Sequence, residues 1–209
     1  MKLYEKSLRR STLIYNGIAI SEEQDDYSEI IRQISAFHTK NLSVLCSYSG
    51  IVKRKGLLQV LELLRIRKDL AYICIGNGEQ KEALIDYAAK NGISDRVFFS
   101  PFKKNPYHVM KYADVFVIPS YSEGFSLALL EAGTVGAAVV CSDIPAFSMP
   151  FCNNEVSFFS LDNIDSFCRA VDDVQCHKEE KIKSLQARIK KDFSEGKMFS
   201  EYEKLYKKL

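Results

Sequence analysis

The 209-residue sequence is 46% hydrophobic and 11% aromatic, which is enough apolar material for one large domain or two small ones. The formal net charge is +2, so charge does not mark a nucleic-acid-binding protein, and we expect no nucleic-acid partner. No uncharged run is long enough to span a bilayer, and the charged residues 1–5 lack the apolar core of a signal peptide. These features predict a cytoplasmic protein.

The cysteines and histidines show no metal-binding spacing. Of the six cysteines, Cys46, Cys74 and Cys141 lie in apolar runs, and the other three follow later in the chain. The three histidines stand apart from one another. We therefore expect free thiols, as in a reducing cytosol, and no metal site.

The first half of the chain alternates between helix and strand patterns. A short strand is predicted over residues 12–15, where the turn signal Asn16-Gly17 ends it, and the acidic patch 22–26 follows. The elements predicted next are a helix over 27–37, a strand over 42–48, a basic loop over 49–56, a helix over 57–67 and a strand over 70–75.

The second half continues the alternation. The turn 76–79 opens a helix that ends near Lys90, where Asn91-Gly92 caps it. The next predicted elements are a strand over 96–100, a short helix over 107–112, a strand over 114–118, a helix that begins near Gly124, a strand over 137–141, an edge strand over 156–159 and a helix over 164–174. From residue 178 the chain is helical and charged, with a break at 193–196 and a final helix over 197–209.

Alternating strands and helices predict an α/β fold, a doubly wound parallel sheet with helices on both faces. Ligands bind to such sheets beyond the carboxyl ends of the strands, where the strand order reverses. The loops over 49–56, 76–79 and 120–124 all follow predicted strands, so we expect them to share one crevice. This is the layout of a nucleotide-binding domain.

Residues 119–133 carry the strongest chemical signal. A helix that starts near Gly124 leaves three backbone N–H groups without intrahelical partners, those of Phe125, Ser126 and Leu127. Such a helix end suits a phosphate or another electron-rich ligand. Glu131 is the only charge after the first turn, so its carboxylate either has a partner or reaches solvent at the edge of the sheet, and the spacing leaves both open.

Seven residues separate Glu123 from Glu131 in the run PSYSEGFSLALLEAGTVGAAVVCSDIPAF, which resembles the E-x7-E region of the retaining GT-B glycosyltransferases of family 4. Further motifs of that family match in the same order along nearly the whole chain. They are the N-G turn at 16–17, the K-G pair at 55–56, the G-x-G turn at 76–78, the D-R-V-x-F strand at 95–99 and the C-terminal helix at 193–206. Several motifs in order are much more specific than one motif alone.

The resemblance implies the C-terminal half of a GT-B fold, with a Rossmann-like nucleotide-sugar-binding domain over 1–192 and a C-terminal helix over 193–209. In the family this helix packs on an N-terminal domain that supplies the acceptor site, and we expect that domain to be missing here. The implied enzyme is a glycosyltransferase that moves a sugar from a nucleotide-diphosphate sugar, with a UDP-sugar as the first expectation, to a glycan or lipid-linked acceptor in polysaccharide biosynthesis. The isolated domain is expected to be inactive.

The resemblance also implies roles for single residues. Glu131 would bind the ribose hydroxyls of the donor, Glu123 would lie beside the transferred sugar, and Lys55 would neutralise the diphosphate as the sugar–phosphate bond breaks. Phe102 lies in the loop that would hold the base. Backbone amides would meet the sugar hydroxyls and the diphosphate, namely those of Gly124, Phe125, Ser126 and Leu127. The family does not generally need a bound metal, and no cofactor is expected. The alternative for Lys55 is one solvated charge of the basic run 53–55, but the position of the K-G pair after a predicted strand favours the functional role.

The sequence departs from the family at one position. Family members carry G-R-L five or six residues before K-G, with the arginine as a second clamp on the diphosphate, and the corresponding residue here is Gly50. Lys53 and Arg54 are the candidate substitutes, although a lysine lacks the bidentate geometry of arginine. The departure bears on donor binding and catalysis more than on the fold.

Two other functions fit parts of the sequence. The missing acceptor domain and Gly50 fit a catalytically incomplete nucleotide-sugar-binding module that acts only with a separate N-terminal partner. Gly76 and Gly78 fit an NAD-binding turn, but Lys81 stands where the third glycine of that motif belongs, so the evidence for an oxidoreductase is weak. The basic region 178–209 fits either peripheral contact with a membrane or a solvated helix face.

Overall fold

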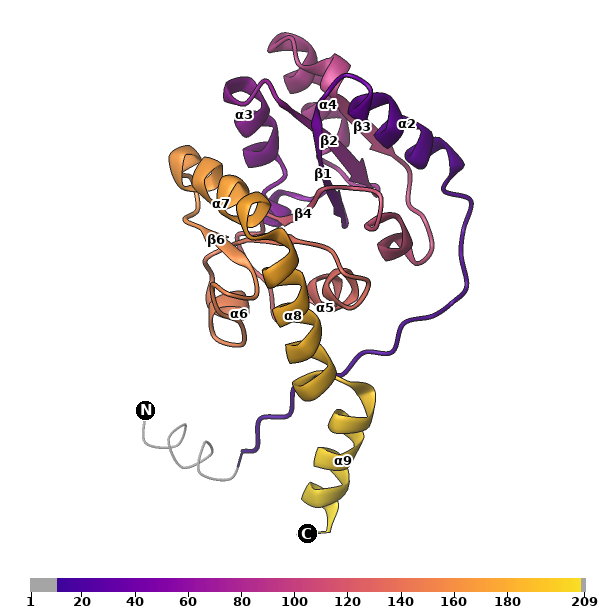
Figure 1. Cartoon of the computed structure of the whole chain (residues 1–209), viewed down its shortest axis with the longest axis vertical. Coiled ribbons are helices and arrows are strands. Elements are labelled where there is room, and N and C mark those ends of the chain that lie inside the picture. Colours follow the sequence, from indigo (N-terminus) through magenta and orange to yellow (C-terminus); the bar gives the residue numbers. More distant parts are fainter. Residues whose placement is uncertain (1–10, 208–209) are drawn as a thin grey trace.

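The computed structural model of the chain describes residues 11–207. Its centre is a six-stranded sheet in the order β3-β2-β1-β4-β5-β6, in which all neighbouring strands run parallel (Figure 1). The strands are β1 (Ser43–Tyr48), β2 (Leu70–Ile75), β3 (Val97–Ser100), β4 (Val115–Ile118), β5 (Val139–Ser142) and β6 (Ser157–Phe159). The predicted doubly wound parallel sheet is confirmed.

Different helices cover the two faces of the sheet. On one face lie α2 (Ser28–His38), α5 (Leu127–Thr134) and α8 (Lys178–Asp192), and on the other lie α3 (Leu58–Ile66), α4 (Lys81–Lys90) and α7 (Ile164–Cys176). Alternate side chains of β1 enter the two cores: Val44 and Cys46 pack with the first group of helices, and Leu45 packs with the second. Burial on both faces explains why the strands are continuous apolar runs.

The remaining described elements are short, apart from the last helix. They are η1 (Lys53–Lys55), η2 (Ser94–Arg96), η3 (Pro106–Val109), α6 (Pro145–Ser148) and α9 (Glu195–Tyr206). No helix within residues 11–207 combines the length and the apolar character that crossing a bilayer requires.

The strand order reverses between β1 and β4. β1 pairs with β2 on one side and with β4 on the other, so the chain leaves these two neighbours toward opposite edges of the sheet. The loops that follow β1 and β4 therefore diverge and leave a crevice between them, at the carboxyl ends of the strands. The loops over 49–56 and 119–126 begin at this point.

Three predicted elements were wrong in detail. Residues 12–15 form no strand, because they lie at the periphery, where Leu13 is 72% exposed and Ile18 makes only an isolated bridge to Ser194. The helix predicted over 107–112 is the single short turn of η3, which Pro106 begins. The final helix starts at residue 195, since the side chain of Ser194 caps it by accepting from the Lys197 amide at 3.3 Å.

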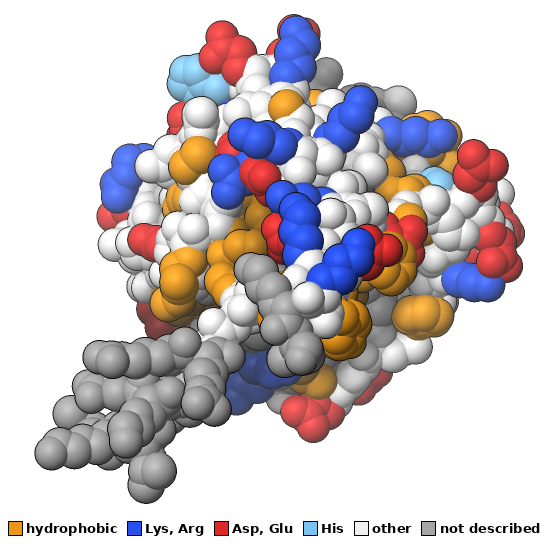
Figure 2. Space-filling model, turned by 90° about the horizontal axis from the view of Figure 1, so that it is seen from below, with side chains coloured by type: hydrophobic (Ala, Val, Ile, Leu, Met, Phe, Trp, Pro, Cys, Tyr) orange, Lys and Arg blue, Asp and Glu red, His pale blue; other side chains and the backbone are white. Residues whose placement is uncertain are grey.

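The segment before α2 lies next to the residues that precede α9. Figure 1 shows it running as extended chain alongside the start of α9. The amide of Ile18 donates to the carbonyl of Phe193 at 2.9 Å, and the aromatic rings of Tyr15, Phe125, Phe151 and Phe193 pack together beside this bond. α9 itself has no buried residue. Figure 2 views the molecule from this end and shows apolar and basic side chains close to one another.

Candidate functional site

Lys55 reaches the crevice because its loop is pressed against the loop after β4. Gly56 ends η1 with φ of 64°, and a Cβ on this glycine would lie 2.0 Å from the carbonyl oxygen of Pro119, so a larger residue would push the two loops apart. The amide of Tyr121 donates to the carbonyl of Arg54 at 2.8 Å and joins the same two loops. Gly56 thus allows the close approach that places the neighbouring Lys55 against the loop after β4.

Glu123 forms a nearly buried ion pair with Lys55. Lys55 Nζ lies 2.6 Å from Glu123 Oε1, and the side chains are 19% and 8% exposed. The hydroxyl of Ser120 donates to the same oxygen at 2.7 Å, while Arg54 Nη1 lies 3.5 Å from Oε2. A carboxylate with two short hydrogen bonds is held in one orientation, so Lys55 is not simply a solvated charge.

The helix after Glu123 begins later than the sequence analysis predicted. α5 starts at Leu127, and Ser126 is its N-cap, with the hydroxyl accepting from the Leu129 amide at 3.3 Å. The predicted helix start near Gly124 was wrong because Ser126 has an extended backbone, so the helix begins only after it. The Ser126 hydroxyl then caps the Leu129 amide, which has no partner within the helix. A Cβ on Gly124 would meet no atom within 4 Å, so the loop is open at this point.

The side chain of Phe125 does not face an open site. Its ring packs 5.8 Å from that of Tyr15 and 6.0 Å from that of Phe193, measured between centroids. Leu127, the first residue of α5, is 47% exposed. Any ligand contact with Phe125 is therefore left to its backbone, in keeping with the predicted role of these residues through their amides.

The carboxylate of Glu131 has a protein partner, Tyr48. The phenol hydroxyl of Tyr48 donates to Glu131 Oε2 at 2.9 Å and lies 3.0 Å from the carbonyl oxygen of Ala128. Burial raises the pKa of Glu131, and the hydrogen bond from Tyr48 lowers it. Of the two alternatives for Glu131, a partnered carboxylate is therefore correct, and the spacing along the sequence did not identify the partner.

A cavity of about 310 Å³ lies beside Glu131. Two other predicted donor-binding residues, Gly50 and Phe102, line it, and Phe102 is 71% exposed. Tyr48 and Asn77 also line it. The cavity thus brings together the ends of β1 and β2, the loop after β3 and α5, as expected for a crevice at the point where strand order reverses.

A turn of the chain packs against the wall of this cavity. Gly76, with φ of 144°, has its backbone so close to the carbonyl of Ser49 that an added Cβ would lie 2.0 Å away. The amide of Ile51 donates to the carbonyl of Asn77 at 2.8 Å. Contact between two backbones accounts for this glycine, so the G-x-G turn needs no dinucleotide to explain it.

The loop after β3 is tied down by the acidic patch of residues 22–26. The amide of Lys104 donates to Asp25 Oδ2 at 2.9 Å, and Lys104 Nζ lies 2.7 Å from Glu23 Oε2. The hydroxyl of Tyr27 donates to the carbonyls of Lys104 and Asn105 at 2.6 and 2.8 Å. This loop carries Phe102, so the acidic patch holds one side of the cavity in place.

Two larger cavities lie elsewhere. One of about 440 Å³ lies between α3 and the start of α7, and one of about 500 Å³ lies along α7 and α8. Neither is lined by a predicted site residue. We place the site at the smaller cavity because it holds the Glu131 carboxylate and lies at the carboxyl ends of the strands.

The predicted site residues fall into two neighbouring groups. Lys55, Glu123 and Gly124 belong to the first, and Gly50, Phe102 and Glu131 belong to the second. Sequence reasoning missed the partners Tyr48 and Ser120, and it named Arg54 only as a candidate phosphate clamp and not as a neighbour of Glu123. The sequence signal of the first two was position alone, since Tyr48 ends β1 and Ser120 precedes Glu123 by three residues. Within the described residues, no three His, Cys, Asp or Glu side chains are placed to hold a metal ion.

The basic region after residue 178 is partly structural. Lys181 is 5% exposed, forms an ion pair with Asp173 at 3.0 Å and donates to the carbonyl of Asn153, so its charge is not available to a surface. Lys178 and Arg188 lie 3.6 and 2.9 Å from carboxylates of Asp114 and Asp192. The exposed basic side chains of α8 are Lys183, Lys190 and Lys191.

Comparison with known proteins identifies the chain's relatives. The family described as Glycosyl transferases group 1 matches residues 27–192. The O-antigen biosynthesis glycosyltransferase WclY of Escherichia coli is 28% identical over 205 residues, which are 96% of this chain and 56% of WclY. The UDP-Gal:alpha-D-GlcNAc-diphosphoundecaprenol alpha-1,3-galactosyltransferase of Escherichia coli is 31% identical over 124 residues, 58% of this chain and 32% of that protein. The chain spans about half the length of WclY.

Solved structures show the same fold. Alr3699/HepE of Anabaena in complex with UDP and glucose superposes with a TM-score of 0.81 at 17% identity, over 95% of this chain and 57% of that one. The lipopolysaccharide outer core galactosyltransferase WaaB gives 0.74 at 18% identity, over 98% and 59%. The matching part is again about half of each protein, as expected for the C-terminal half of a GT-B fold. With this fold and the family match over most of its length, the chain belongs to the glycosyl transferases group 1 family.

Proposed function

We propose that this chain is the donor-binding half of a retaining glycosyltransferase, and that its crevice binds a nucleotide-diphosphate sugar. The observation that carries the proposal is the meeting of two acids and one lysine at the point where strand order reverses. Glu131 lies on α5 at a cavity of about 310 Å³, and the Lys55–Glu123 pair lies just before the start of the same helix. Parallel sheets bind nucleotides at this position.

The two groups divide the donor between them in this proposal. Glu131 accepts hydrogen bonds from the ribose hydroxyls, and the exposed ring of Phe102 covers the base. Lys55 neutralises the diphosphate as the bond from the anomeric carbon to the phosphate oxygen breaks. An ammonium has three N–H donors, so the bond to Glu123 leaves donors for phosphate oxygens. Glu123 lies beside the transferred sugar, next to the open backbone of Gly124.

A UDP-sugar is the first donor to test. The name of one relative specifies UDP-Gal, and solved structures of the same fold hold UDP and UDP-glucose. The names of two relatives also point to an acceptor class, because they specify sugars linked to diphospho-undecaprenol. We extend that class, a lipid-linked glycan, to the complete enzyme that contains this domain, working at the cytoplasmic face of a membrane. No separate cofactor is part of the proposal.

The binding proposal is tested by calorimetry with UDP, GDP and ADP, and by replacing the ribose-binding acid. We expect saturable binding of UDP, weaker binding after Glu131→Ala, and a melting temperature near that of the wild type. Calorimetric affinity that Glu131→Ala leaves unchanged would contradict the ribose role. If none of the three nucleotides binds, the donor-binding function is wrong.

The alternative is a catalytically incomplete module that works only with a separate N-terminal partner. Gly50, which stands where family members carry an arginine, favours it. Transfer from UDP-galactose is measured for this chain alone and after addition of the N-terminal half of WclY. We expect no turnover by this chain alone. Turnover without the added half would rule out both the incomplete module and the expectation that the isolated domain is inactive.

A further inference from the structure

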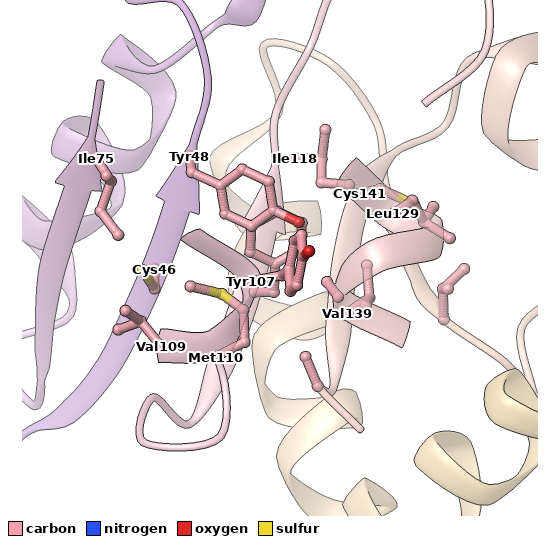
Figure 3. Close-up of a cluster of buried hydrophobic side chains, with 14 of the residues drawn as sticks. Cys46, Tyr48, Ile75, Tyr107, Val109, Met110, Ile118, Leu129, Val139 and Cys141 are labelled. Carbon is pink, nitrogen blue, oxygen red and sulfur yellow. The ribbon is translucent and has the colours of Figure 1, made fainter. Parts of the chain in front are cut away.

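Tyr48 is fixed in place at the end of β1. It is 9% exposed, and its ring stacks on that of Phe116 with centroids 4.8 Å apart. Figure 3 shows the ring directed away from β1, with its hydroxyl pointing toward α5, the helix that carries Leu129. Since packing already restricts this side chain, the hydroxyl meets Glu131 at little further cost in conformational freedom.

The phenol is a donor that stays protonated. Burial raises the pKa of Tyr48 well above its usual value, and the Glu131 carboxylate adds to this effect. Burial raises the pKa of Glu131 above its usual value, and the hydrogen bond from Tyr48 limits this rise because it favours the carboxylate. Three further ionisable groups lie near this pair: Lys103 in the lining of the same cavity, Cys46 on β1 and Tyr107 from η3.

We propose that Tyr48 is a positioning residue, which keeps Glu131 ionised and turned so that its carboxylate accepts from the ribose hydroxyls of the donor. The inference rests on the proposed function. Its physical reason is that a carboxylate only accepts hydrogen bonds, whereas a neutral carboxyl group also presents an O–H donor to the ribose. The bond at Oε2 leaves Oε1 to receive the ribose hydroxyls.

The test compares affinities for UDP and for 2′,3′-dideoxy-UDP, which lacks both ribose hydroxyls. A hydrogen bond to a charged group is worth enough that the wild-type protein should prefer UDP about tenfold or more. We expect Tyr48→Phe to lose most of this preference while its binding of the dideoxy ligand stays near that of the wild type. A tyrosine with only a structural role would weaken both ligands equally, so the ratio separates the two roles.

Tyr72→Phe is the matched control. Tyr72 is a fully buried tyrosine on the neighbouring strand β2, and its hydroxyl bonds to the hydroxyl of Ser47 instead of a carboxylate. Removing this hydroxyl changes buried packing to the same extent. We expect the Tyr72→Phe protein to keep the preference for UDP.

The pH dependence of UDP binding gives a second readout. The Glu131 carboxylate is present above its pKa and is lost as pH falls through it. Removing the Tyr48 hydroxyl raises that pKa, so affinity should fall at a higher pH in Tyr48→Phe than in the wild type. If Tyr48→Phe does not fold, 3-fluorotyrosine at position 48 replaces it. This more acidic phenol is a stronger donor and should move the fall in affinity to lower pH.

The outcomes separate the inference from the function on which it rests. Wild-type protein that binds UDP and dideoxy-UDP equally would overturn the ribose role of Glu131 and this inference together. A wild-type preference that persists unchanged in Tyr48→Phe, with the same pH dependence, would overturn the inference alone. Loss of preference in Tyr48→Phe and not in Tyr72→Phe supports it.

Discussion

At the scale of single residues, the ion pair between Lys55 and Glu123 is the most constrained contact of the site. Glu123 is 8% exposed and accepts from both Lys55 and Ser120. Removing one partner of a buried ion pair leaves an uncompensated charge and costs much more than removing both partners. Losing either partner alone is therefore costly, and the pair holds the lysine at the proposed diphosphate position.

Lys55→Met should destabilise the folded protein by about 2 kcal/mol, somewhat less than for a fully buried pair because Lys55 is 19% exposed. Urea unfolding measures this change. The double variant Lys55→Met/Glu123→Gln should recover part of the loss because the unpaired charge is gone. Arg54→Ala is the matched control, since Arg54 is 59% exposed and 3.5 Å from the carboxylate, and it should change stability by no more than about 0.5 kcal/mol. Equal effects of Lys55→Met and Arg54→Ala would contradict this account.

Gly50 offers a gain-of-function experiment. A Cβ at this position would meet nothing within 4 Å, and φ lies outside the left-handed region, so Gly50→Arg should fold normally. An arginine at the cavity adds a bidentate donor for phosphate, and UDP should bind about tenfold more tightly at low salt, with the gain shrinking as salt is added.

Gly196→Arg controls for the added charge. Gly196 lies on α9, and its Cβ position is also open. This variant should leave UDP affinity unchanged. Equal UDP affinities of Gly50→Arg, Gly196→Arg and wild-type protein would show that an arginine at position 50 does not strengthen UDP binding.

At the scale of elements, the join between the segment before α2 and the start of α9 depends on one glycine. A Cβ on Gly17 would lie 2.4 Å from the carbonyl oxygen of Ser194. The adjacent bond from the Ile18 amide to Phe193 requires this close approach. Phe193 in turn packs against Phe125 of the loop after β4, so the join lies next to the candidate site.

Gly17→Ala should destabilise the protein by about 1–3 kcal/mol because two backbones must move apart. Hydrogen exchange at the Ile18 amide should speed up more than exchange within β1. Gly196→Ala is a control in open space on a helix, where alanine should stabilise by about 0.5–1 kcal/mol. Unaltered protection at Ile18 would mean that the join does not depend on Gly17.

At the scale of the whole molecule, the C-terminal helix contributes little to the core. α9 has no buried residue, and its Phe199 and Tyr206 are 55% and 68% exposed. Phe193, just before it, is 1% exposed and belongs to the core that includes α5 and α8. Phe193 therefore packs with the domain, although the predicted boundary assigns it to the C-terminal helix.

Two truncations test where the domain ends. A chain that stops after Ser194 should keep a melting temperature within a few degrees of the full chain. A chain that stops after Asp192 also loses the buried ring of Phe193 and should be destabilised by about 3–5 kcal/mol. Thermal unfolding of the two proteins gives the comparison, and similar losses for both would show that α9 belongs to the folded unit.

Local sequence patterns were sufficient to predict the fold class, the family, and the six strands and intervening helices in their order along the chain. These patterns are the continuous apolar runs of β1, β2 and β4, the glycine-bearing turns after strands, and an E-x7-E spacing that joins the loop after β4 to α5. Two of the failed predictions have different causes, one local and one tertiary. Ser126 caps α5 with its side chain, and residues 12–15 lack the neighbouring strand that would make them one.

The partners of the two acids are visible only in the folded chain. Glu131 meets Tyr48 across 83 positions of the chain, and Glu123 meets Lys55 across 68. Periodicity reports which face of a helix a residue occupies, but it carries no information about which residue of another element lies opposite. That is set by the reversal of strand order between β1 and β4 and by the close approach of Gly56 to Pro119, both of which exist only in the folded chain.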